Sequence, residues 1–330
     1  MPTAARAQRA QSEKTRRVSG ATASTERAGR TATRFARSRE YEVKASRSQL
    51  VNIRDLTYHV RSWGDPGAPK VFMLHGWMDV GASFQFLVDA LERDWHVIAP
   101  DWRGFGKSAW CADGYWFADY IADLEAIVER FEPGEAARLV GHSLGGNVVT
   151  LYAGIRPKRV SKVVSLDGFG IPAESAEAAP QKYIKWLDAL NDPPTFAPYA
   201  SLAEVADRLQ KNNARLPRDK AEFLAEHWAE TLPDGSARLV SDPRHKLPFP
   251  IVYRMEEVRA IWARVEAPVL WVGASASFVT KWLGEGEEGL QQRMRALRDC
   301  RFVTIPNAGH MLHHDQPRAV AAVIEPFLAT

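Results

Sequence analysis

The stretch Gly-His-Ser-Leu-Gly-Gly at residues 141–146 decides how the whole chain is interpreted. A short apolar run at 136–140 leads into it, and a segment with helical character follows at 147–153. A strand, a sharp turn and a helix in this order would hold Ser143 at a positive φ, where small residues two positions away on either side prevent clashes. Both positions are glycine. The pattern therefore predicts a strained serine at a helix N-terminus, where free backbone N–H groups favour a developing negative charge and the serine can act as a nucleophile.

The composition sets broad limits on the fold and the compartment. With 330 residues, 45% of them hydrophobic, the chain can bury one large core and a subdomain. No stretch is apolar over the length of a bilayer, so we expect no membrane span. Cys111 and Cys300 are far apart and lack metal-ligand spacing, which favours free thiols in a reducing compartment. We predict a cytoplasmic protein, with organellar import through the basic N-terminal segment as the alternative.

The basic residues are concentrated at the N-terminus. Residues 1–40 hold ten Lys or Arg and three Asp or Glu, a local charge of +7. Since the formal net charge of the chain is +3, the remaining residues carry −4, and the body of the protein shows no basic excess for nucleic acid. Residues 1–40 also contain almost no large apolar side chains, and we predict that they form a disordered basic tail.

Strand-like and helix-like segments alternate over residues 41–170 and again over 262–330. Alternating apolar and polar residues at 41–63 indicate two or three antiparallel strands. A continuous apolar run, typical of a buried parallel strand, occupies 71–74, and further strand-like segments occupy 96–100, 136–140, 160–166, 268–273 and 301–305. Because helical segments separate these runs, we predict an α/β fold with a mostly parallel eight-stranded sheet flanked by helices.

Residues 171–261 interrupt this alternation. They contain amphipathic helical stretches rich in Trp, Leu and Ala, broken by prolines, and no clear buried strand. We interpret them as a helical cap inserted into the core formed by 41–170 and 262–330.

Several motifs agree in type and order with one known family. They are His75-Gly76-Trp77, the loop at 101–108, the serine turn at 141–146, the helical insertion, and Gly309-His310. On these motifs the chain resembles the α/β-hydrolase superfamily from residue 41 to its end. Two cap segments, Asp-Pro-Arg-His-Lys-Leu-Pro at 242–248 and Tyr-Arg-Met-Glu-Glu at 253–257, are similar to the serine-hydrolase-like (Kraken-type) branch. The resemblance implies an α/β-hydrolase fold with Ser143 at its nucleophile elbow.

His310 is the predicted base that activates the serine. It follows the last predicted strand after Gly309, where the C-terminal edge of the sheet would face it towards the elbow. His313 and His314 fall at the expected start of the terminal helix, and we expect them to be solvated or structural. A metal site formed with Asp315 is not expected, because no further ligands have suitable spacing.

Two other histidines are expected to have structural roles. We expect His75 to hold its loop through backbone hydrogen bonds, and His142 to pack beside the elbow rather than act as a base. The loop at 101–108 has the Asp, Arg and Gly content of a braced loop.

The oxyanion of an acyl-transfer intermediate needs two preorganised donors. The resemblance places the backbone N–H groups of Trp77 and Leu144 in those roles, so neither depends on a side chain. Trp77, Trp186 and Trp228 are candidates for the walls of an apolar substrate site, although core packing explains tryptophans equally well.

The acid is the point at which this sequence departs from the family. Members usually carry an Asp shortly after the seventh strand, but residues 273–279 read Gly-Ala-Ser-Ala-Ser-Phe-Val. Some members place the acid after the sixth strand, where Asp167 lies, and we assign Asp167 as the acid that fixes the histidine tautomer. The alternatives are Glu285, Glu287 or Glu288, a Ser-His dyad, or an inactive protein.

These residues together predict a carboxylesterase-like serine hydrolase. It would act on carboxylic esters of small or medium apolar substrates through an acyl-enzyme on Ser143, with no cofactor and no metal. Haloalkane dehalogenases and epoxide hydrolases carry Asp at the elbow, so the serine argues against both. A C–C hydrolase or perhydrolase would share the same triad, and a non-catalytic ligand-binding module of this fold is the other alternative. The substrate and the oligomeric state are not predicted.

Overall fold

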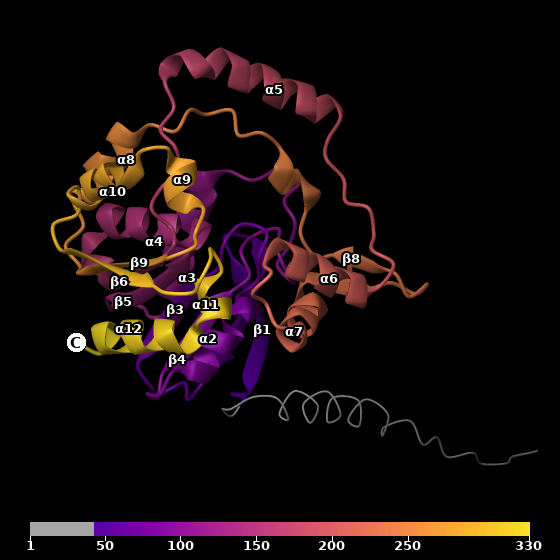
Figure 1. The fold of residues 1–330 in the computed structure, drawn as a ribbon, viewed down its shortest axis with the longest axis horizontal. Helices are drawn as coiled ribbons and strands as arrows, with labels where there is room; N and C mark the ends of the chain where they lie inside the picture. Colours follow the sequence, from indigo (N-terminus) through magenta and orange to yellow (C-terminus); the bar gives the residue numbers. More distant parts are fainter. Residues whose placement is uncertain (1–42) are drawn as a thin grey trace, which may run out of the picture. The chain divides into compact units, whose positions relative to one another are not determined.

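The central feature of the computed structural model, which describes residues 43–330, is an eight-stranded sheet (Figure 1). The tail predicted at 1–40 lies outside the described residues. The strand order is β1-β2-β4-β3-β5-β6-β9-β10. The strands are β1 (Ser46–Ile53), β2 (Leu56–Trp63), β3 (Lys70–Leu74), β4 (His96–Pro100), β5 (Ala137–His142), β6 (Val160–Leu166), β9 (Val269–Ala274) and β10 (Cys300–Ile305). The pairs β1–β2 and β2–β4 are antiparallel and the other five are parallel, so the predicted mostly parallel sheet is confirmed.

Two hydrophobic cores lie on the two faces of this sheet. Successive strand residues alternate between them, because side chains of a strand point to opposite faces: Phe72 and Leu74 belong to one core, and Val71 and Met73 to the other. The first core is closed by α3 (Phe117–Phe131), α4 (Leu144–Ile155), α8 (Met255–Trp262) and α10 (Gly286–Met294). The second is closed by η1 (Gly81–Phe84), α2 (Gln85–Ala90), α11 (Leu312–Asp315) and α12 (Pro317–Ala329).

A long insertion separates β6 from α8, the helix that packs into the first core and leads towards β9. It contains α5 (Ala179–Asn191), α6 (Leu202–Asn212), α7 (Arg218–Trp228), β7 (Ala229–Thr231) and β8 (Ala237–Leu239). A third hydrophobic cluster holds α6 and α7 together, whereas α5 buries no residue and lies apart from the sheet at the top of Figure 1.

The β7–β8 pair was not predicted, since helices alone were expected in this insertion. Each of its strands has only three residues, too few for an alternating pattern to be recognised. The turn between them includes Gly235, whose φ of +87° is one that glycine adopts without strain. Within residues 43–330, no helix has the combination of length and apolar character needed to cross a membrane.

The sheet brings the loops that carry the predicted site residues to one edge. His142 pairs with Leu166, and Leu166 pairs with Val272, so the parallel strands β5, β6 and β9 end side by side. Strand β10 ends beside β9, where Ile305 pairs with Ala274. Ligand sites of open α/β sheets lie at the carboxyl ends of the strands. Ser143, Asp167 and the loop to His310 all begin at this edge.

Candidate active site

Ser143 occupies a sharp turn between β5 and α4. Its backbone has φ 52° and ψ −112°, and its N–H donates to the Leu166 carbonyl at 2.9 Å. The flanking glycines are required by close approach of the backbone. A Cβ on Gly141 would lie 2.3 Å from Gly145, and a Cβ on Gly145 would lie 2.0 Å from the Leu74 carbonyl oxygen. The sequence pattern thus corresponds to a strained turn that leaves no room for larger residues.

Asp167 and His310 meet at the same edge of the sheet. The Nδ1 atom of His310 lies 2.7 Å from the Oδ2 atom of Asp167. The Asp167 side chain is 1% exposed, whereas that of His310 is 22% exposed. Asp167 also has a positive φ, 51°, and its N–H donates to the Val272 carbonyl at 2.8 Å. The carboxylate is therefore fixed in the interior while the imidazole reaches the surface.

Ser277 is a member of this site that the sequence did not predict. Its hydroxyl donates to Oδ2 of Asp167 at 2.5 Å and accepts from the N–H of Val279 at 3.1 Å. The next residue, Phe278, packs its ring against His310 with centroids 5.0 Å apart. The signal was present in the sequence, because this is the loop in which family members usually carry the acid. Here the loop supplies a hydroxyl that positions the acid of the neighbouring strand.

Glu285, an alternative candidate for the acid, has a different partner. It lies at the start of α10, and both of its carboxylate oxygens accept from the guanidinium of Arg293, which is fully buried. The hydrogen bonds from Arg293 lower the pKa of Glu285. Glu287 and Glu288 lie in the first turn of the same helix. Asp167 is the carboxylate that contacts His310.

Of the two predicted oxyanion donors, one follows Ser143 directly and the other lies in a loop that packs against it. Leu144 is the first residue of α4, where a backbone N–H has no acceptor within the helix. Trp77 lies in the loop after β3, which packs against the elbow closely enough that a Cβ on Gly76 would be 3.2 Å from the Ser143 Cβ. The side chain of Trp77 is 51% exposed.

His75 braces this loop through its backbone contacts. Its Nδ1 lies 2.7 Å from the Gly76 carbonyl oxygen, and its Nε2 accepts from the Trp102 N–H at 2.8 Å. The indole of Trp102 donates in turn to the His75 carbonyl at 3.0 Å. Burial lowers the pKa of His75 to about 4, so the ring is neutral at pH 7, as these hydrogen bonds require.

The three candidate tryptophans do not share one setting. Trp228 donates its indole N–H to Oδ1 of Asp79 at 3.1 Å, which ties it to the same loop as Trp77. Trp186 lies on α5, where its ring contacts that of Trp116 with centroids 6.2 Å apart. Trp77 and Trp228 are therefore linked to the loop after β3, whereas Trp186 contacts the residue before α3.

Unusual backbone conformations are concentrated around this edge. Four of the six non-glycine residues with positive φ in residues 43–330 lie in the loops described here, namely Met78, Ser143, Asp167 and Asn307. Each such conformation costs about 1–3 kcal/mol and persists only where its surroundings enforce it. Strain of this kind is typical of functional sites.

His313 and His314 were expected to be solvated or structural; both are buried, so the solvated alternative is wrong and the structural one remains. Their short helix α11 packs against η1 and α2, and burial lowers the pKa of both rings well below 6.5. Asp315 does not join them. Its carboxylate accepts from the Gly309 N–H at 2.8 Å and from the Asn213 side chain at 2.7 Å, and it thereby braces the loop that carries His310.

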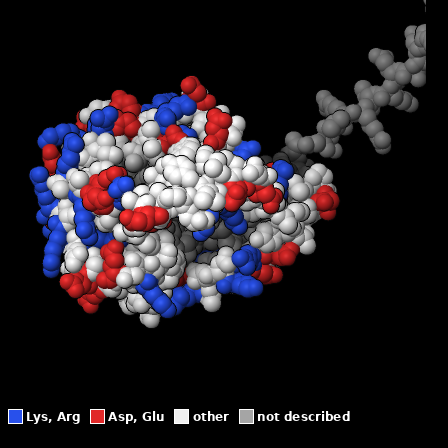
Figure 2. All heavy atoms as spheres, turned by 90° about the horizontal axis from the view of Figure 1, so that it is seen from above, with Lys and Arg blue, Asp and Glu red and all other residues white. Residues whose placement is uncertain are grey.

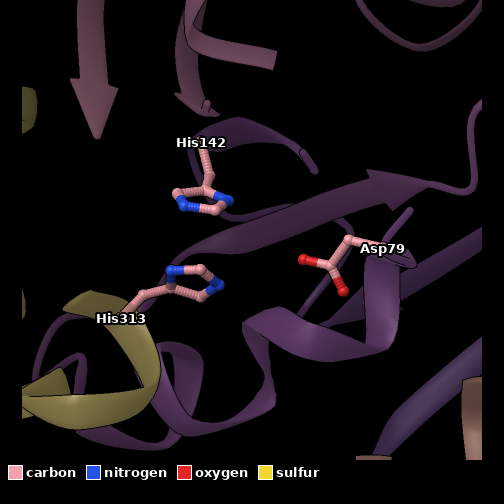
Figure 3. Close-up of side chains that lie close together, drawn as sticks. All are labelled: Asp79, His142 and His313. Carbon is pink, nitrogen blue, oxygen red and sulfur yellow. The ribbon is translucent and has the colours of Figure 1, made fainter. Parts of the chain in front are cut away.

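His313 lies close to Asp79 and to His142, the residue before Ser143 (Figure 3). One ligand atom from each of the three residues lies within 4.8 Å of the other two, and all three side chains are buried. Burial raises the pKa of Asp79 to about 7 and lowers that of His142 well below 6.5. Sequence spacing gave no sign of this cluster, because its members come from three distant segments.

Comparisons with known proteins agree with this architecture. A family model described as the alpha/beta hydrolase fold matches residues 69–317. A serine hydrolase-like protein of Danio rerio is 28% identical over 278 residues, covering 81% of this chain and 83% of that protein. The solved structure of the hypothetical protein PA1622 from Pseudomonas aeruginosa PAO1 superposes with a TM-score of 0.77 at 28% identity, covering 86% of this chain and 99% of that one.

A thioesterase domain from the curacin biosynthetic pathway shares the fold at 23% identity. It covers 85% of this chain and 99% of its own, with a TM-score of 0.74. The predicted fold class and the predicted resemblance are both confirmed by these matches.

Proposed function

The chain belongs to the α/β hydrolase fold family, and from this premise we propose that it is a serine hydrolase acting on carboxylic esters with small or medium apolar groups. The observation that carries the proposal is the contact of 2.7 Å between His310 Nδ1 and Asp167 Oδ2 at the strand edge that also holds Ser143 at positive φ. A buried carboxylate on one nitrogen of an imidazole leaves the other nitrogen as a base for a nearby hydroxyl.

In the proposed reaction His310 acts first as base and then as acid. With the Nδ1 proton directed at Asp167, Nε2 carries the lone pair and takes the proton of Ser143 as Oγ attacks the acyl carbon. The carbonyl electron pair moves to oxygen, and the oxyanion accepts hydrogen bonds from the N–H groups of Trp77 and Leu144. When this intermediate collapses, the C–O bond to the alcohol breaks and His310 protonates the leaving oxygen. Water then hydrolyses the acyl-enzyme by the same steps.

Apolar side chains around the strand edge support the proposed substrate class. Trp77 and Phe278 flank the proposed residues and are 51% and 57% exposed. Helix α5 exposes further large apolar side chains, namely Tyr183, Ile184, Leu187 and Leu190. Figure 2, which looks down on the α5 side, shows uncharged surface across the middle of this face and a hollow beside it. An apolar acyl or alcohol group gains free energy by covering such surface.

Labelling by a fluorophosphonate and hydrolysis of a p-nitrophenyl ester series test this proposal directly. The wild-type protein should label and turn over, and Ser143→Ala should do neither. His310→Ala and Asp167→Asn should lower kcat by about 10⁴-fold. Ser275→Ala is the control for loss of a serine hydroxyl outside the proposed triad, because Ser275 is exposed, and it should label and turn over like the wild type.

Two other outcomes would change the proposal. If Asp167→Asn kept activity near that of the wild type, the acid would have to lie elsewhere. If the wild-type protein neither labelled nor hydrolysed any ester, a non-catalytic ligand-binding module would replace the enzyme as the best account of the fold.

A further inference from the structure

Asp79, His142 and His313 converge on one buried point behind the nucleophile elbow (Figure 3). Asp79 follows β3, His142 ends β5, and His313 lies on α11, so three separate segments contribute one side chain each. Their relative exposures are 2%, 1% and 0%. The proposed reaction uses none of these side chains.

The hydrogen bonding of His142 fixes which of its ring nitrogens faces the cluster with a lone pair. Its Nε2 lies 2.9 Å from the backbone carbonyl oxygen of His310. A carbonyl oxygen only accepts, so Nε2 must carry the proton, and in a neutral ring Nδ1 is then an acceptor. This Nδ1 is buried and has no hydrogen-bond partner among the described residues.

Only one of the two carboxylate oxygens of Asp79 accepts hydrogen bonds from the described residues. Its Oδ1 accepts from the N–H of Val80, the hydroxyl of Ser83 and the indole of Trp228. These donors are all neutral, so none supplies a positive charge. Its Oδ2 is buried and has no partner within the described part of the chain. A buried carboxylate with an open oxygen and no counter-charge lowers stability unless a proton or a cation joins it.

His313 completes the set. Both of its ring nitrogens are buried without a partner in residues 43–330, and its ring lies 4.5 Å from that of His142 between centroids. Asp79 and His142 thus each bring to the cluster one acceptor without a partner, Oδ2 and Nδ1, and His313 brings an imidazole without a hydrogen bond. A carboxylate oxygen and an imidazole lone pair cannot donate to each other, and a neutral His313 offers a single N–H, so the space suits an occupant that attracts lone pairs.

We propose that Asp79, His142 and His313 form a binding site for one divalent transition-metal ion, with Zn²⁺ the best match. Two imidazoles and a carboxylate are a characteristic zinc donor set, and a positive ion supplies the charge that the carboxylate lacks. The three ligands leave one coordination position for a water molecule.

Small side-chain rotations would bring the three ligands to the geometry of a bound ion. Zinc holds such ligands at about 2.0–2.1 Å, so tetrahedral ligand atoms lie about 3.4 Å apart. The three atoms here are within 4.8 Å of one another. On binding zinc, each ligand atom would move inward by less than about 1 Å, a distance that rotation of its side chain can supply.

The proposed metal site lies where it can stabilise the backbone around Ser143, and it does not face the substrate. His142 directly precedes Ser143, and its Nε2–H holds the backbone carbonyl of His310. A metal ion on Nδ1 would fix this ring between the two segments that carry the proposed nucleophile and base. Because the ligands are buried, the ion would be a structural or regulatory one.

Metal retention by the full-length protein tests the proposal. After incubation with Zn²⁺ and gel filtration, inductively coupled plasma mass spectrometry should find one zinc per chain in the wild type. Asp79→Asn and His313→Gln should each retain less than one tenth of that amount. His314→Gln is the matched control, since this neighbouring histidine is equally buried but outside the cluster, and it should retain one zinc. Ser143→Ala should also retain one, which separates this test from that of the proposed function.

Diffraction from wild-type crystals soaked in Zn²⁺ gives an answer even if a variant fails to fold. Anomalous scattering at the zinc edge should show one peak between the three side chains. The proposal is overturned if that position holds only a water molecule, if the wild-type protein retains no zinc, or if folded Asp79→Asn and His313→Gln retain as much as the wild type.

Discussion

The molecule contains two Asp–His pairs of the same geometry at the same edge of its sheet. In each, a histidine Nδ1 lies 2.7 Å from an aspartate Oδ2: His59 with Asp101, and His310 with Asp167. Each aspartate directly follows a strand, β4 or β6. The contact alone therefore does not distinguish a catalytic pair from a structural one.

The two pairs differ in what surrounds them. The His59 and Asp101 side chains are each 4% exposed, and the free nitrogen of His59 lies 3.0 Å from the Ser48 hydroxyl. Asp101 also accepts from the N–H groups of Gly81 and Lys107, so the network is closed on all sides. His310, by contrast, reaches the surface and packs against His142, the residue before the strained Ser143. Access to a second reactant distinguishes the pair proposed to be catalytic.

Replacing each histidine by glutamine should produce opposite losses. His310→Gln should lower kcat for p-nitrophenyl esters by about 10⁴-fold, because the base is lost. It should lower the free energy of unfolding less than His59→Gln does, because the His310 side of its pair is open to solvent and Ser277 still donates to Asp167. His59→Gln should leave kcat per folded molecule within about threefold and lower the free energy of unfolding by about 3 kcal/mol, because a buried pair is broken. Urea unfolding and steady-state kinetics measure both quantities. The comparison fails if the two variants lose activity to the same extent.

The buried His75 should make the folded protein less stable as the pH falls. Burial lowers the pKa of His75 to about 4 from an ordinary value of 6.5. Between these values the unfolded chain binds a proton that the folded protein refuses, so this residue removes stability as the pH falls from 6.5 to 4, in total about 3 kcal/mol. Above 6.5 neither state is protonated there, and the contribution vanishes.

The variant His75→Gln isolates this contribution from that of other titrating groups. Burial raises the pKa of Asp79 to about 7, so Asp79 adds stability as the pH falls through this range. Because Asp79 is present in both proteins, its contribution cancels in the comparison. The variant should start less stable at pH 7 but lose less on acidification to pH 4.5, as measured by urea unfolding. Equal losses in the two proteins would show that His75 is protonated in the folded state.

Much of this architecture was predictable from local sequence. The apolar run at 160–166 became β6 with the expected bounds, and the glycines at 141 and 145 lie where the backbone leaves no room for a Cβ. Asp167 and His310 were singled out by their position after strands, and the topology of a parallel sheet brings such positions together. Short-range pattern and chain topology were sufficient for these features.

Other features depend on packing that local pattern does not encode. Ser277 contacts Asp167 across 110 residues of sequence, and nothing in its own loop identifies the partner. The approach of His313 to Asp79 and His142 depends on how α11 packs against η1 and α2. The β7–β8 pair depends on three-residue strands that only a tertiary context stabilises.

Removing the Ser277 hydroxyl should have a moderate effect confined to turnover. Asp167 keeps its contact with His310 in Ser277→Ala but loses a donor that fixes its orientation, and we expect kcat to fall about tenfold with KM unchanged. Ser277→Thr, which retains a hydroxyl, should restore most of the loss, and Ser275→Ala should stay within twofold of the wild type. A rise in KM with kcat intact would instead place Ser277 in substrate binding.

The smallest effect on turnover should come from the side chain nearest to the proposed oxyanion. In Trp77→Ala the backbone N–H remains, so kcat for a short ester should stay within about threefold of the wild type. The exposed indole is an apolar surface, and its loss should raise KM about five- to tenfold for a longer acyl chain, about 1 kcal/mol of lost contact. Steady-state kinetics on acetyl and octanoyl p-nitrophenyl esters separates the two effects. A 100-fold fall in kcat on the acetyl ester would mean that the indole itself holds the proposed catalytic residues in place. The difference between the His310–Asp167 and His59–Asp101 pairs would then depend on the packing around His310 as well as on its access to substrate.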